Sequence, residues 1–303
     1  MGLFEYTAQQ RTLTIGGVRI GGLPGRIPTV VVASIFYSKD RLVKNAETGE
    51  FDRSGTEGIL NMLSDMSGKT GLPTMLDVVA STPSAMKEYL PYLVDACDFP
   101  LMIDGSGDNA VNSAGILVAK ESGFLDRTIL NSITPGTKDE IYEVVRETGL
   151  RNALLLTFDT RAMTSVTKRV ELADQLIKRA RETGITNILL DTGVLDLLTL
   201  GIACKAQMIL KDKYGLPIGN GAHNAVSTWR GLVPKFGKDA KAPALVGACL
   251  ISVVLGADYV MMGPAKEAPI VYPSVAMVDT VLAGSLLEDG IRPERPHPRY
   301  MIS

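Results

Sequence analysis

The sequence predicts a single (β/α)8 TIM barrel preceded by an N-terminal β-hairpin. Eight short apolar stretches alternate with eight helical patterns, and the linkers between them are short, which is the rhythm of a parallel sheet closed by helices. A length of 303 residues is long for one ordinary domain but normal for an α/β barrel. No break in composition divides the chain, so we expect residues 1–303 to form one domain. An open, doubly wound sheet is the alternative.

The chain begins with a predicted hairpin that should close the N-terminal end of the barrel. The stretch TLTIGGVRIGG, residues 12–22, alternates in polarity and carries a Gly-Gly turn. The first core strand is PTVVVASIFYS, residues 28–38, and a charged loop from Lys39 to Gly55 follows it. Thr56 is expected to cap a helix over about 57–67.

The rest of the chain repeats one unit, a buried strand followed by a helix. Each strand is a short apolar run of the kind that is buried on both faces. Pro83 stands in the first turn of its helix, where its missing N–H is harmless. The predicted strands are 71–81, 100–103, 127–136, 152–160, 187–193, 216–225 and 257–266. The predicted helices are 83–95, 108–122, 138–148, 166–183, one that ends near 214, 240–256 and 273–287, and the tail 290–303 is Pro-rich and irregular.

Composition argues against several classes of protein. The chain is 46% hydrophobic and 21% charged, so it can bury a large core. Its net charge is −2 and no basic block stands out, which argues against nucleic acid as a partner. The N-terminus has no signal sequence and no apolar run reaches about 18 residues, so we expect a cytoplasmic protein that does not span a membrane.

Cysteine and histidine usage argues against a metal site. Cys97, Cys204 and Cys249 fit no CxxC pattern and are expected to be buried, reduced residues. Only two histidines are present, His223 and His297, so a zinc site of His and Cys ligands is not expected. We therefore predict that the chain binds no metal.

Polar residues stand at the ends of four predicted strands. The strand in FPLMIDGS stops at Asp104, and the later strands RTILNS, NILLDTG and LPIGNG end at Asn131, Asp191 and Asn220. The C-terminal ends of barrel strands form the active site of TIM-barrel enzymes. Helix capping explains any one of these residues as well as function does. Four at equivalent positions predict one binding site.

Other polar residues near strand ends have equally plausible structural roles. Asp77 lies within a strand, where a buried structural partner is as plausible as a functional one. Asp159 and Arg161 could form a salt bridge at the rim. His223 is a candidate general acid or a loop histidine with a satisfied hydrogen bond, and we favour the second.

Two glycine-containing segments and two cations complete the candidates. The segments 105–107 and 219–221 resemble phosphate loops only weakly, because they lack the Walker lysine and carry acidic or amide neighbours. Close approach of the backbone to a flat ligand is a better use of these glycines. Arg230 and Lys235 could meet the carboxylate tail of a ligand, although a solvated surface is the simpler interpretation.

The strand-end chemistry permits a pterin as the ligand. A carboxylate accepts two parallel N–H bonds, so it suits an amidine-like edge. The 2-amino-4-oxo-pyrimidine ring of a pterin presents that edge, and an amide side chain can both donate to and accept from such a ring. These residue types permit a pterin but do not require one.

The run GGLPGRIPTVVVASIFYSKDRLV, with the later turn TGEFD, makes the assignment more specific. From about Leu13 to Arg299 the chain resembles the MtrH/MtgA family. This family contains the H subunit of tetrahydromethanopterin S-methyltransferase and free-standing methylcorrinoid protein:tetrahydrofolate methyltransferases of glycine betaine metabolism. The resemblance implies an enzyme that moves a methyl group from a methylcorrinoid protein to N5 of tetrahydrofolate, giving 5-methyltetrahydrofolate and cob(I)alamin.

The resemblance also implies roles for the strand-end residues. In pterin-binding methyltransferases, an Asp, an Asn and a later Asp that close successive strands hold the pterin ring, and these roles fall to Asp104, Asn131 and Asp191. An Asn after the next strand reaches the reacting N5. Asn220 is the favoured match and the catalytic candidate, because the barrel holds its backbone, and Asn224 is its rival.

Partners and alternatives follow from the same resemblance. The chain lacks a D-x-H-x-x-G corrinoid signature, so the corrinoid, a cobalamin-type cofactor, should arrive on a partner protein. We also expect a homodimer. The alternatives are a subunit specific for tetrahydromethanopterin, a pterin enzyme of the dihydropteroate synthase type, and a non-catalytic scaffold for methyl transfer. The synthase would need a cationic pocket for pyrophosphate, and only Lys266 stands near a strand end.

Overall fold

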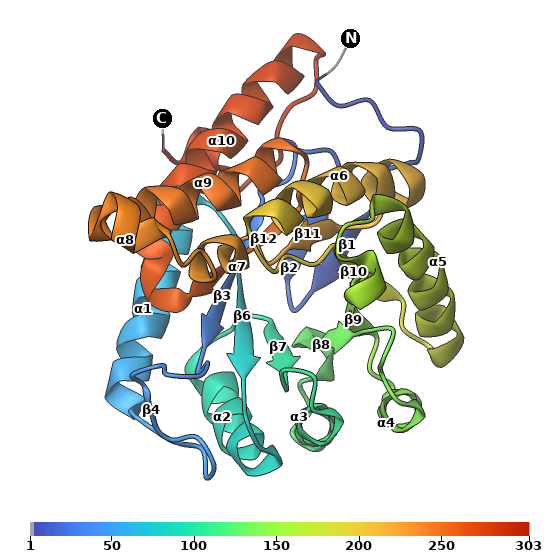
Figure 1. The fold of residues 1–303 in the computed structure, drawn as a ribbon, viewed down its shortest axis with the longest axis vertical. Coiled ribbons are helices and arrows are strands. Elements are labelled where there is room, and N and C mark those ends of the chain that lie inside the picture. Colours follow the sequence, from blue (N-terminus) through green and yellow to red (C-terminus); the bar gives the residue numbers. More distant parts are fainter. Residues whose placement is uncertain (1–2, 303) are drawn as a thin grey trace.

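The computed structural model describes residues 3–302 and contains a closed barrel of eight parallel strands surrounded by helices (Figure 1). The strands follow one another around the barrel in the order β10-β11-β12-β3-β6-β7-β8-β9, and pairing of β9 with β10 closes it. The predicted TIM barrel is confirmed, and the open doubly wound sheet is excluded. Residues 1, 2 and 303 of the predicted domain lie outside the described residues.

Every predicted strand and helix of the barrel is present; all strands are shorter than predicted except the third, which is shifted by one residue. The strands are β3 (Val30–Ile35), β6 (Thr74–Val79), β7 (Leu101–Asp104), β8 (Thr128–Ile133), β9 (Asn152–Leu156), β10 (Asn187–Asp191), β11 (Ile218–Asn220) and β12 (Tyr259–Pro264). The principal helices are α1 (Arg53–Thr70), α2 (Pro83–Ala96), α3 (Asn109–Glu121), α4 (Asp139–Thr148), α5 (Val166–Thr183), α6 (Leu197–Tyr214), α9 (Lys241–Val254) and α10 (Ala268–Glu288).

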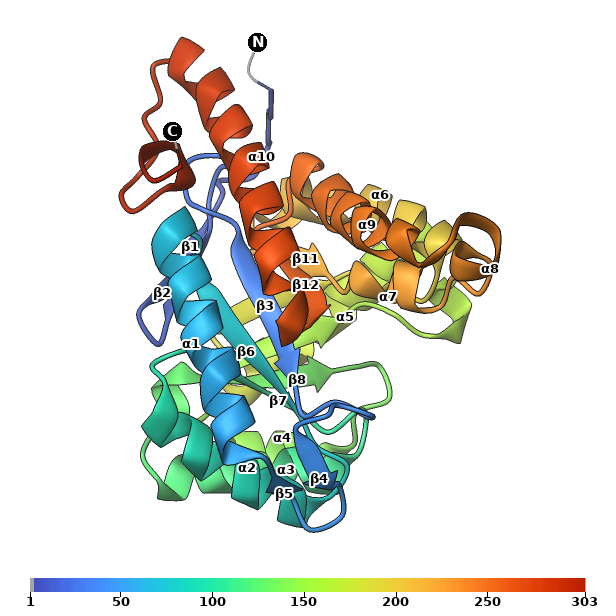
Figure 2. The same ribbon diagram turned by 90° about the vertical axis from the view of Figure 1, so that its left-hand side faces the viewer.

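The predicted hairpin consists of β1 (Thr12–Ile15) and β2 (Val18–Gly21), paired antiparallel. Ile15 and Ile20 are fully buried and pack with the residues that fill the barrel interior. The turn at Gly16 lies against Arg127, which directly precedes β8, so the hairpin covers the N-terminal end of the barrel. Figure 2 places it on the opposite side of the barrel from the two short helices that follow β11. The C-terminal end is therefore the open one.

Two regions contain structure that was not predicted from the sequence. The charged loop after β3 forms a small hairpin, β4 (Val43–Asn45) and β5 (Glu50–Phe51). The ring centroid of Phe51 lies 4.9 Å from that of Phe36 and 5.6 Å from that of Tyr89. Burial of these three rings holds the loop on the barrel. The long connection after β11 contains α7 (His223–Ser227) and α8 (Leu232–Phe236).

The first helix has a different cap from the predicted one. Helix α1 begins at Arg53, and the side chain of Asp52 accepts a hydrogen bond from the N–H of Gly55 at 3.2 Å. Thr56 is fully buried in the first turn, and its hydroxyl donates to the carbonyl of Asp52 at 2.8 Å. The prediction for Thr56 is wrong because the helix starts one turn earlier than the apolar pattern indicates.

Replacing Asp52 by alanine is expected to lower the free energy of unfolding by about 1 kcal/mol, because the partly buried N–H of Gly55 in the first turn loses its acceptor. Chemical denaturation measures this loss. The matched control is Asp65→Ala in the same helix, since Asp65 is exposed and pairs only with Lys69 one turn on. The control should change the unfolding free energy by less than about 0.5 kcal/mol. Equal losses in the two variants would show that Asp52 is not the cap.

Helix α10 is the longest and one of the most apolar helices among the described residues. Together with the preceding turn it is long and apolar enough to cross a membrane, but half of its most apolar window is buried inside this structure. It packs beside α1 and α9 on the outside of β3 and β12 (Figure 2). Its buried Asp279 accepts hydrogen bonds from the backbone N–H and the hydroxyl of Thr29, both at 2.7 Å. Burial raises the pKa of Asp279 to about 7. This packing is that of the eighth helix of a barrel.

The closed end of the barrel also contains a buried ion pair. The ammonium of Lys211 on α6 lies 2.7 Å from both carboxylate oxygens of Asp258, which stands just before β12. Asp258 also accepts from the N–H of Ile218 at 2.8 Å. The pair joins α6 to the starts of β11 and β12, away from the open end, and a buried carboxylate of this kind needs such partners.

The tail and the cysteines follow the predictions with one exception. The tail is irregular apart from a single 3-10 turn, Pro298–Tyr300, and His297 before it is fully buried. All three cysteines are free; Cys204 and Cys249 are buried, as expected, whereas Cys97 is only half-buried.

Candidate functional site

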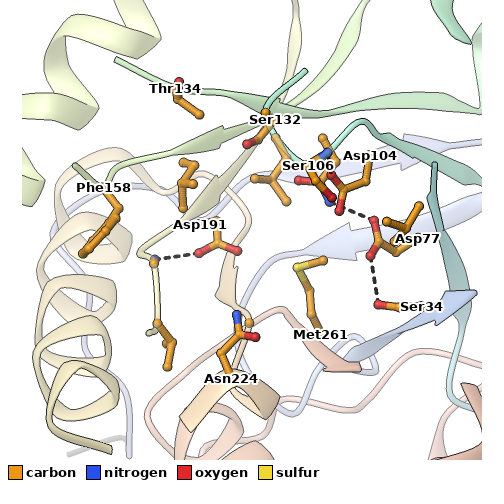
Figure 3. Close-up of a pocket in the computed structure, with 18 of the residues that line it drawn as sticks. Ser34, Asp77, Asp104, Ser106, Ser132, Thr134, Phe158, Asp191, Asn224 and Met261 are labelled. Atoms are coloured by element: carbon orange, nitrogen blue, oxygen red, sulfur yellow. Dashed lines mark hydrogen bonds between the residues drawn. The ribbon is translucent and has the colours of Figure 1, made fainter. Parts of the chain in front are cut away.

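A cavity of about 730 Å³ opens at the C-terminal ends of the barrel strands (Figure 3). Every barrel strand except β11 contributes lining residues, and the segment after β11 completes the wall. The polar lining includes Ser34, Asp77, Asp104, Asn131, Asp191 and Asn224, and the apolar lining includes Leu154, Leu156, Phe158, Val194 and Met261. The cavity therefore combines hydrogen-bonding groups with apolar walls, as sites for small flat ligands do.

Three of the predicted strand-end residues meet in this cavity. Asp104 and Asn131 are paired across β7 and β8 in the same register, so their side chains lie next to each other. Asp191 ends β10 and faces Asp104 from another part of the wall (Figure 3). Asp104 Oδ1 accepts from the N–H of Ser106 at 2.6 Å, and Asp191 Oδ1 accepts from the N–H of Gly193 at 2.6 Å. These turns fix one oxygen of each carboxylate.

Asp77 belongs to the same site, a role that the sequence left open. It is 3% exposed and accepts from the hydroxyl of Ser34 at 2.8 Å and from the amide nitrogen of Asn131 at 2.9 Å. Asp77 therefore sets the orientation of the Asn131 amide. Within residues 3–302 the Asn131 side-chain carbonyl oxygen forms no hydrogen bond, which leaves it available to a ligand.

The electrostatics of the cavity favour a ligand that donates hydrogen bonds. Burial, reinforced by the charge of Asp104, raises the pKa of Asp77 to about 7. Burial raises the pKa of Asp191 to about 6, against the opposing effects of the Gly193 N–H and Arg169, and it also raises the pKa of Asp104. No lysine or arginine lines this cavity in the described part of the chain. Three carboxyl groups without a cation among them would repel a phosphate and attract N–H donors.

A buried arginine that the sequence did not reveal supports Asp191. Arg169 on α5 is fully buried, and its guanidinium donates to the carbonyls of Thr192 and Gly193, the latter at 2.6 Å, as well as to nearby carbonyls that follow β9. Its central carbon lies 5.1 Å from the ring centroid of Phe158, which lines the cavity. Arg169 thus fixes the turn whose N–H binds Asp191. In the sequence it looks like any solvated residue of an amphipathic helix.

The structure contradicts the expectation that Asn220 faces the site. Asn220 is fully buried, its amide nitrogen donates to Gln207 on α6 at 3.0 Å, and its carbonyl oxygen accepts from Ser252 on α9 at 3.0 Å. Side chains alternate across a barrel strand, and the last residue of β11 points outward to the helices. Asn224, one turn into the following segment, lines the cavity instead. That segment is helix α7 and not part of the strand predicted over 216–225.

His223 has the structural role that the sequence favoured. Its Nδ1 lies 3.1 Å from the carbonyl oxygen of Met261, and because a carbonyl can only accept, Nδ1 carries the proton in this contact. Burial lowers the pKa of His223. The ring packs on Gly263, where a Cβ atom would lie 2.8 Å from the imidazole, so glycine is required there. His223 begins α7 rather than lying in a loop.

Of the remaining candidates, one pair forms a salt bridge next in sequence to the cavity-lining Phe158, and one segment lines the cavity itself. Asp159 and Arg161 form the expected salt bridge, with 2.5 Å between Oδ2 and a guanidinium nitrogen, and Arg161 is exposed. Ser106 and Gly107 line the cavity, with φ angles of 50° and 91°.

Among residues 3–302 no group of three or more His, Cys, Asp or Glu side chains is arranged to hold a metal ion.

Comparison with known proteins identifies the family. Residues 8–294 match the family model of the tetrahydromethanopterin S-methyltransferase MtrH subunit. The H subunit of this enzyme from Methanocaldococcus jannaschii is 31% identical over 315 residues, covering 98% of both chains. The corresponding protein from Methanosarcina barkeri is 34% identical over 304 residues, covering 95% of this chain and 96% of that protein.

Solved structures show the same barrel at low sequence identity. Dihydropteroate synthase from Yersinia pestis, solved with a pterine-sulfa conjugate, has a TM-score of 0.63 at 16% identity and covers 88% of this chain and 99% of its own. The enzyme from Xanthomonas albilineans with 7,8-dihydropteroate has a TM-score of 0.61 at 14% identity, covering 90% and 99%. This likeness shows the fold alone. By the match to the family model and the identity to both relatives over nearly their whole length, the chain belongs to the family of the H subunit of tetrahydromethanopterin S-methyltransferase, MtrH.

Proposed function

We propose that this methyltransferase moves a methyl group between N5 of a tetrahydropterin and a corrinoid carried by a partner protein. The observation that supports the proposal most is the cation-free cavity at the open end of the barrel, where Asp104, Asn131 and Asp191 meet. A pterin ring has N–H donors along its 2-amino edge and a carbonyl acceptor beside them. Two carboxylates and one amide match this pattern, and a carboxylate binds two parallel N–H groups best.

The apolar walls complete the proposed pterin site. Leu156, Phe158 and Met261 line the cavity together with its polar residues. A flat heterocycle can place its faces against such side chains while its edge meets the carboxylates. Arg169 and Asp77 do not need to touch the ring. They position Asp191 and Asn131 through the hydrogen bonds described above, as a supporting layer does for residues that bind a ligand.

The names of the relatives favour tetrahydromethanopterin as the pterin. The family and the similar proteins from Methanocaldococcus jannaschii and Methanosarcina barkeri are named for tetrahydromethanopterin S-methyltransferase. Tetrahydrofolate, the acceptor first expected from the sequence, becomes the alternative. Both molecules present the same hydrogen-bonding edge, so the proposed ring site serves either one.

The chemical step needs placement more than acid or base strength. Toward the pterin, the N5 lone pair attacks the methyl carbon, the cobalt–carbon bond breaks, and cobalt keeps the electron pair as cob(I)alamin. N5 then loses its proton to give the 5-methyltetrahydropterin. The reverse direction methylates cob(I)alamin and returns the proton to N5. Asn224, on the cavity wall, is our candidate to accept from the N5 proton and orient it, in place of Asn220.

The partner side of the proposal concerns the open end of the barrel. The corrinoid must reach N5 from solvent, so we propose that its carrier protein docks over this end, in the cytoplasm. The homodimer expected from the sequence remains a prediction. The dihydropteroate synthase alternative is disfavoured because, in the described part of the chain, no cation lines the cavity to receive pyrophosphate. A non-catalytic scaffold would bind partner proteins without affinity for any tetrahydropterin.

A methyl-transfer assay tests the proposal. The protein is mixed with methylcob(III)alamin and either tetrahydromethanopterin or tetrahydrofolate, and cob(I)alamin is followed by its absorbance under anaerobic conditions. Transfer to at least one pterin is expected, and the faster one identifies the natural class. No transfer to either pterin, with no binding of either in calorimetry, would refute the proposed function.

Pterin affinity is expected to fall as the pH is lowered through about 6, because Asp191 must be ionised to accept two N–H bonds and its pKa is raised to about 6. The limiting slope is about tenfold in affinity per pH unit for one proton. In the protein without a ligand, the raised pKa of Asp191 makes folding stability change with pH in the opposite direction to pterin affinity. Ionising Asp191 lowers folding stability as the pH rises from about 4 to 6, and bound N–H donors offset this loss.

Calorimetric dissociation constants between about pH 5 and 8 measure this dependence. The control is Asp191→Asn, in which residue 191 no longer titrates and the profile should flatten. An equally steep profile in both proteins would assign the titration to another group.

A further inference from the structure

We infer that a second cavity beside the pterin site binds the anionic tail of the tetrahydropterin. The cavity has a volume of about 410 Å³ and is called the side cavity here. It is lined by Trp229, Arg230, Lys241 and Lys266 among others, from the segment after β11, the start of α9 and the turn after β12. It shares three lining residues with the main cavity, His223, Ser227 and Pro264. The two cavities therefore adjoin.

The two cavities have opposite electrostatic character. The main cavity is lined by carboxyl groups and no lysine or arginine, whereas the side cavity is lined by three cations and one carboxylate, Glu267. Within residues 3–302 none of Arg230, Lys241 and Lys266 lies within 4.0 Å of a carboxylate oxygen, so their charges are not neutralised by ion pairs. A molecule with an N–H-rich head and an anionic end therefore fits with its head in the main cavity and its anionic end in the side cavity.

Trp229 supplies an aromatic surface between the two ends of such a molecule. It lines the side cavity and is held by an edge-to-face contact with Phe236, with 6.0 Å between ring centroids. Tetrahydrofolate and tetrahydromethanopterin carry an arene beyond the ring system and one or more acidic groups beyond the arene. An arene can pack on Trp229 while the acidic groups meet the cations.

The structure also separates the two cations considered from the sequence. Arg230 lines the side cavity, whereas Lys235 is exposed on α8 and does not line it. Lys266, which stands after β12, does line it. Lys235 therefore provides a matched control for both cations, with the same charge in the same neighbourhood but no contact with the proposed ligand.

The test compares pterins with and without a tail, and it rests on the proposed function. Calorimetry is performed with tetrahydromethanopterin, tetrahydrofolate and the tail-less 6-methyltetrahydropterin on the wild type, Arg230→Gln/Lys266→Gln and Lys235→Gln. The double variant should weaken binding of a tailed pterin about 3- to 30-fold, the range for two partly exposed charge pairs, and the loss should shrink with added salt. The double variant should bind 6-methyltetrahydropterin with wild-type affinity. Lys235→Gln should bind both tailed and tail-less pterins with wild-type affinity.

Fluorescence provides a second readout, since Trp229 is the only tryptophan of the chain. A tailed pterin should alter its emission beyond the inner-filter effect, and 6-methyltetrahydropterin should not. Equal weakening of tailed and tail-less pterins in the double variant, or no weakening of either, would overturn the inference. So would a Trp229 response to methylcobalamin or inorganic phosphate but not to a tailed pterin, because the anion would then come from the corrinoid or from solution. Failure of the proposed function is distinct: 6-methyltetrahydropterin would not bind the wild type at all.

Discussion

Replacing Asp191 by asparagine is expected to weaken tetrahydropterin binding about 10- to 150-fold, the range for losing a hydrogen bond to a charged group. Asp191 is 5% exposed, and one of its oxygens is already engaged by the Gly193 N–H. An asparagine must place its NH2 group toward either that N–H or the donor edge of the ligand, and both contacts are unfavourable. Calorimetry with the preferred pterin measures the loss.

The control for this substitution is Asp174→Asn on α5. Asp174 is exposed and pairs only with Lys213, outside the cavity, so the same chemical change there should leave pterin affinity unaltered. Asp104→Ala should weaken binding to a similar extent as Asp191→Asn. If Asp191→Asn binds the pterin as tightly as the wild type, the ring does not lie against this carboxylate.

Asn224→Ala is expected to slow methyl transfer by about 100-fold while weakening pterin binding much less, because misplacing a reacting atom by about 1 Å has an effect of this order. Asn224 lines the cavity and is the one asparagine in the sequence between β11 and β12. Its bond to N5 should strengthen as N5 changes charge, so the loss appears in the transfer step. Single-turnover kinetics, with dissociation constants measured in parallel, separate the two effects.

Asn220→Ala is the informative comparison for Asn224→Ala. It leaves Gln207 and Ser252 without their buried partner, so the free energy of unfolding should fall by about 1–3 kcal/mol. Transfer by the folded variant should stay near the wild-type rate. The reverse pattern, slow transfer in Asn220→Ala and normal transfer in Asn224→Ala, would restore the original assignment of Asn220.

The sequence predicted the barrel and much of the site because both depend on local patterns. Asp104, Asn131 and Asp191 each end an apolar run, and parallel strands bring such ends together whatever the details of packing. The chain is a methyltransferase of the MtrH family, as the GGLPG…SIFYS motif indicated. The family could also be recognised from the sequence, because its motif is a continuous stretch of the chain.

What the sequence could not predict depends on contacts between distant segments. β11 is only three residues long, so its alternation was too short to show that Asn220 points outward. Arg169 is buried because carbonyls from two separate loops surround it, and no helical pattern encodes those loops. Phe51 packs on Phe36 of its own strand–helix unit and on Tyr89 of the next one, and because the contact with Tyr89 joins two units, the small hairpin before α1 was missed.

The most direct test of this account is a crystal structure of the protein with its preferred tetrahydropterin bound. We expect the ring in the main cavity, with its 2-amino edge within hydrogen-bond distance of Asp104 and Asp191 and N5 facing Asn224. A ring bound elsewhere, or bound in this cavity with its N–H edge turned away from both carboxylates, would contradict it.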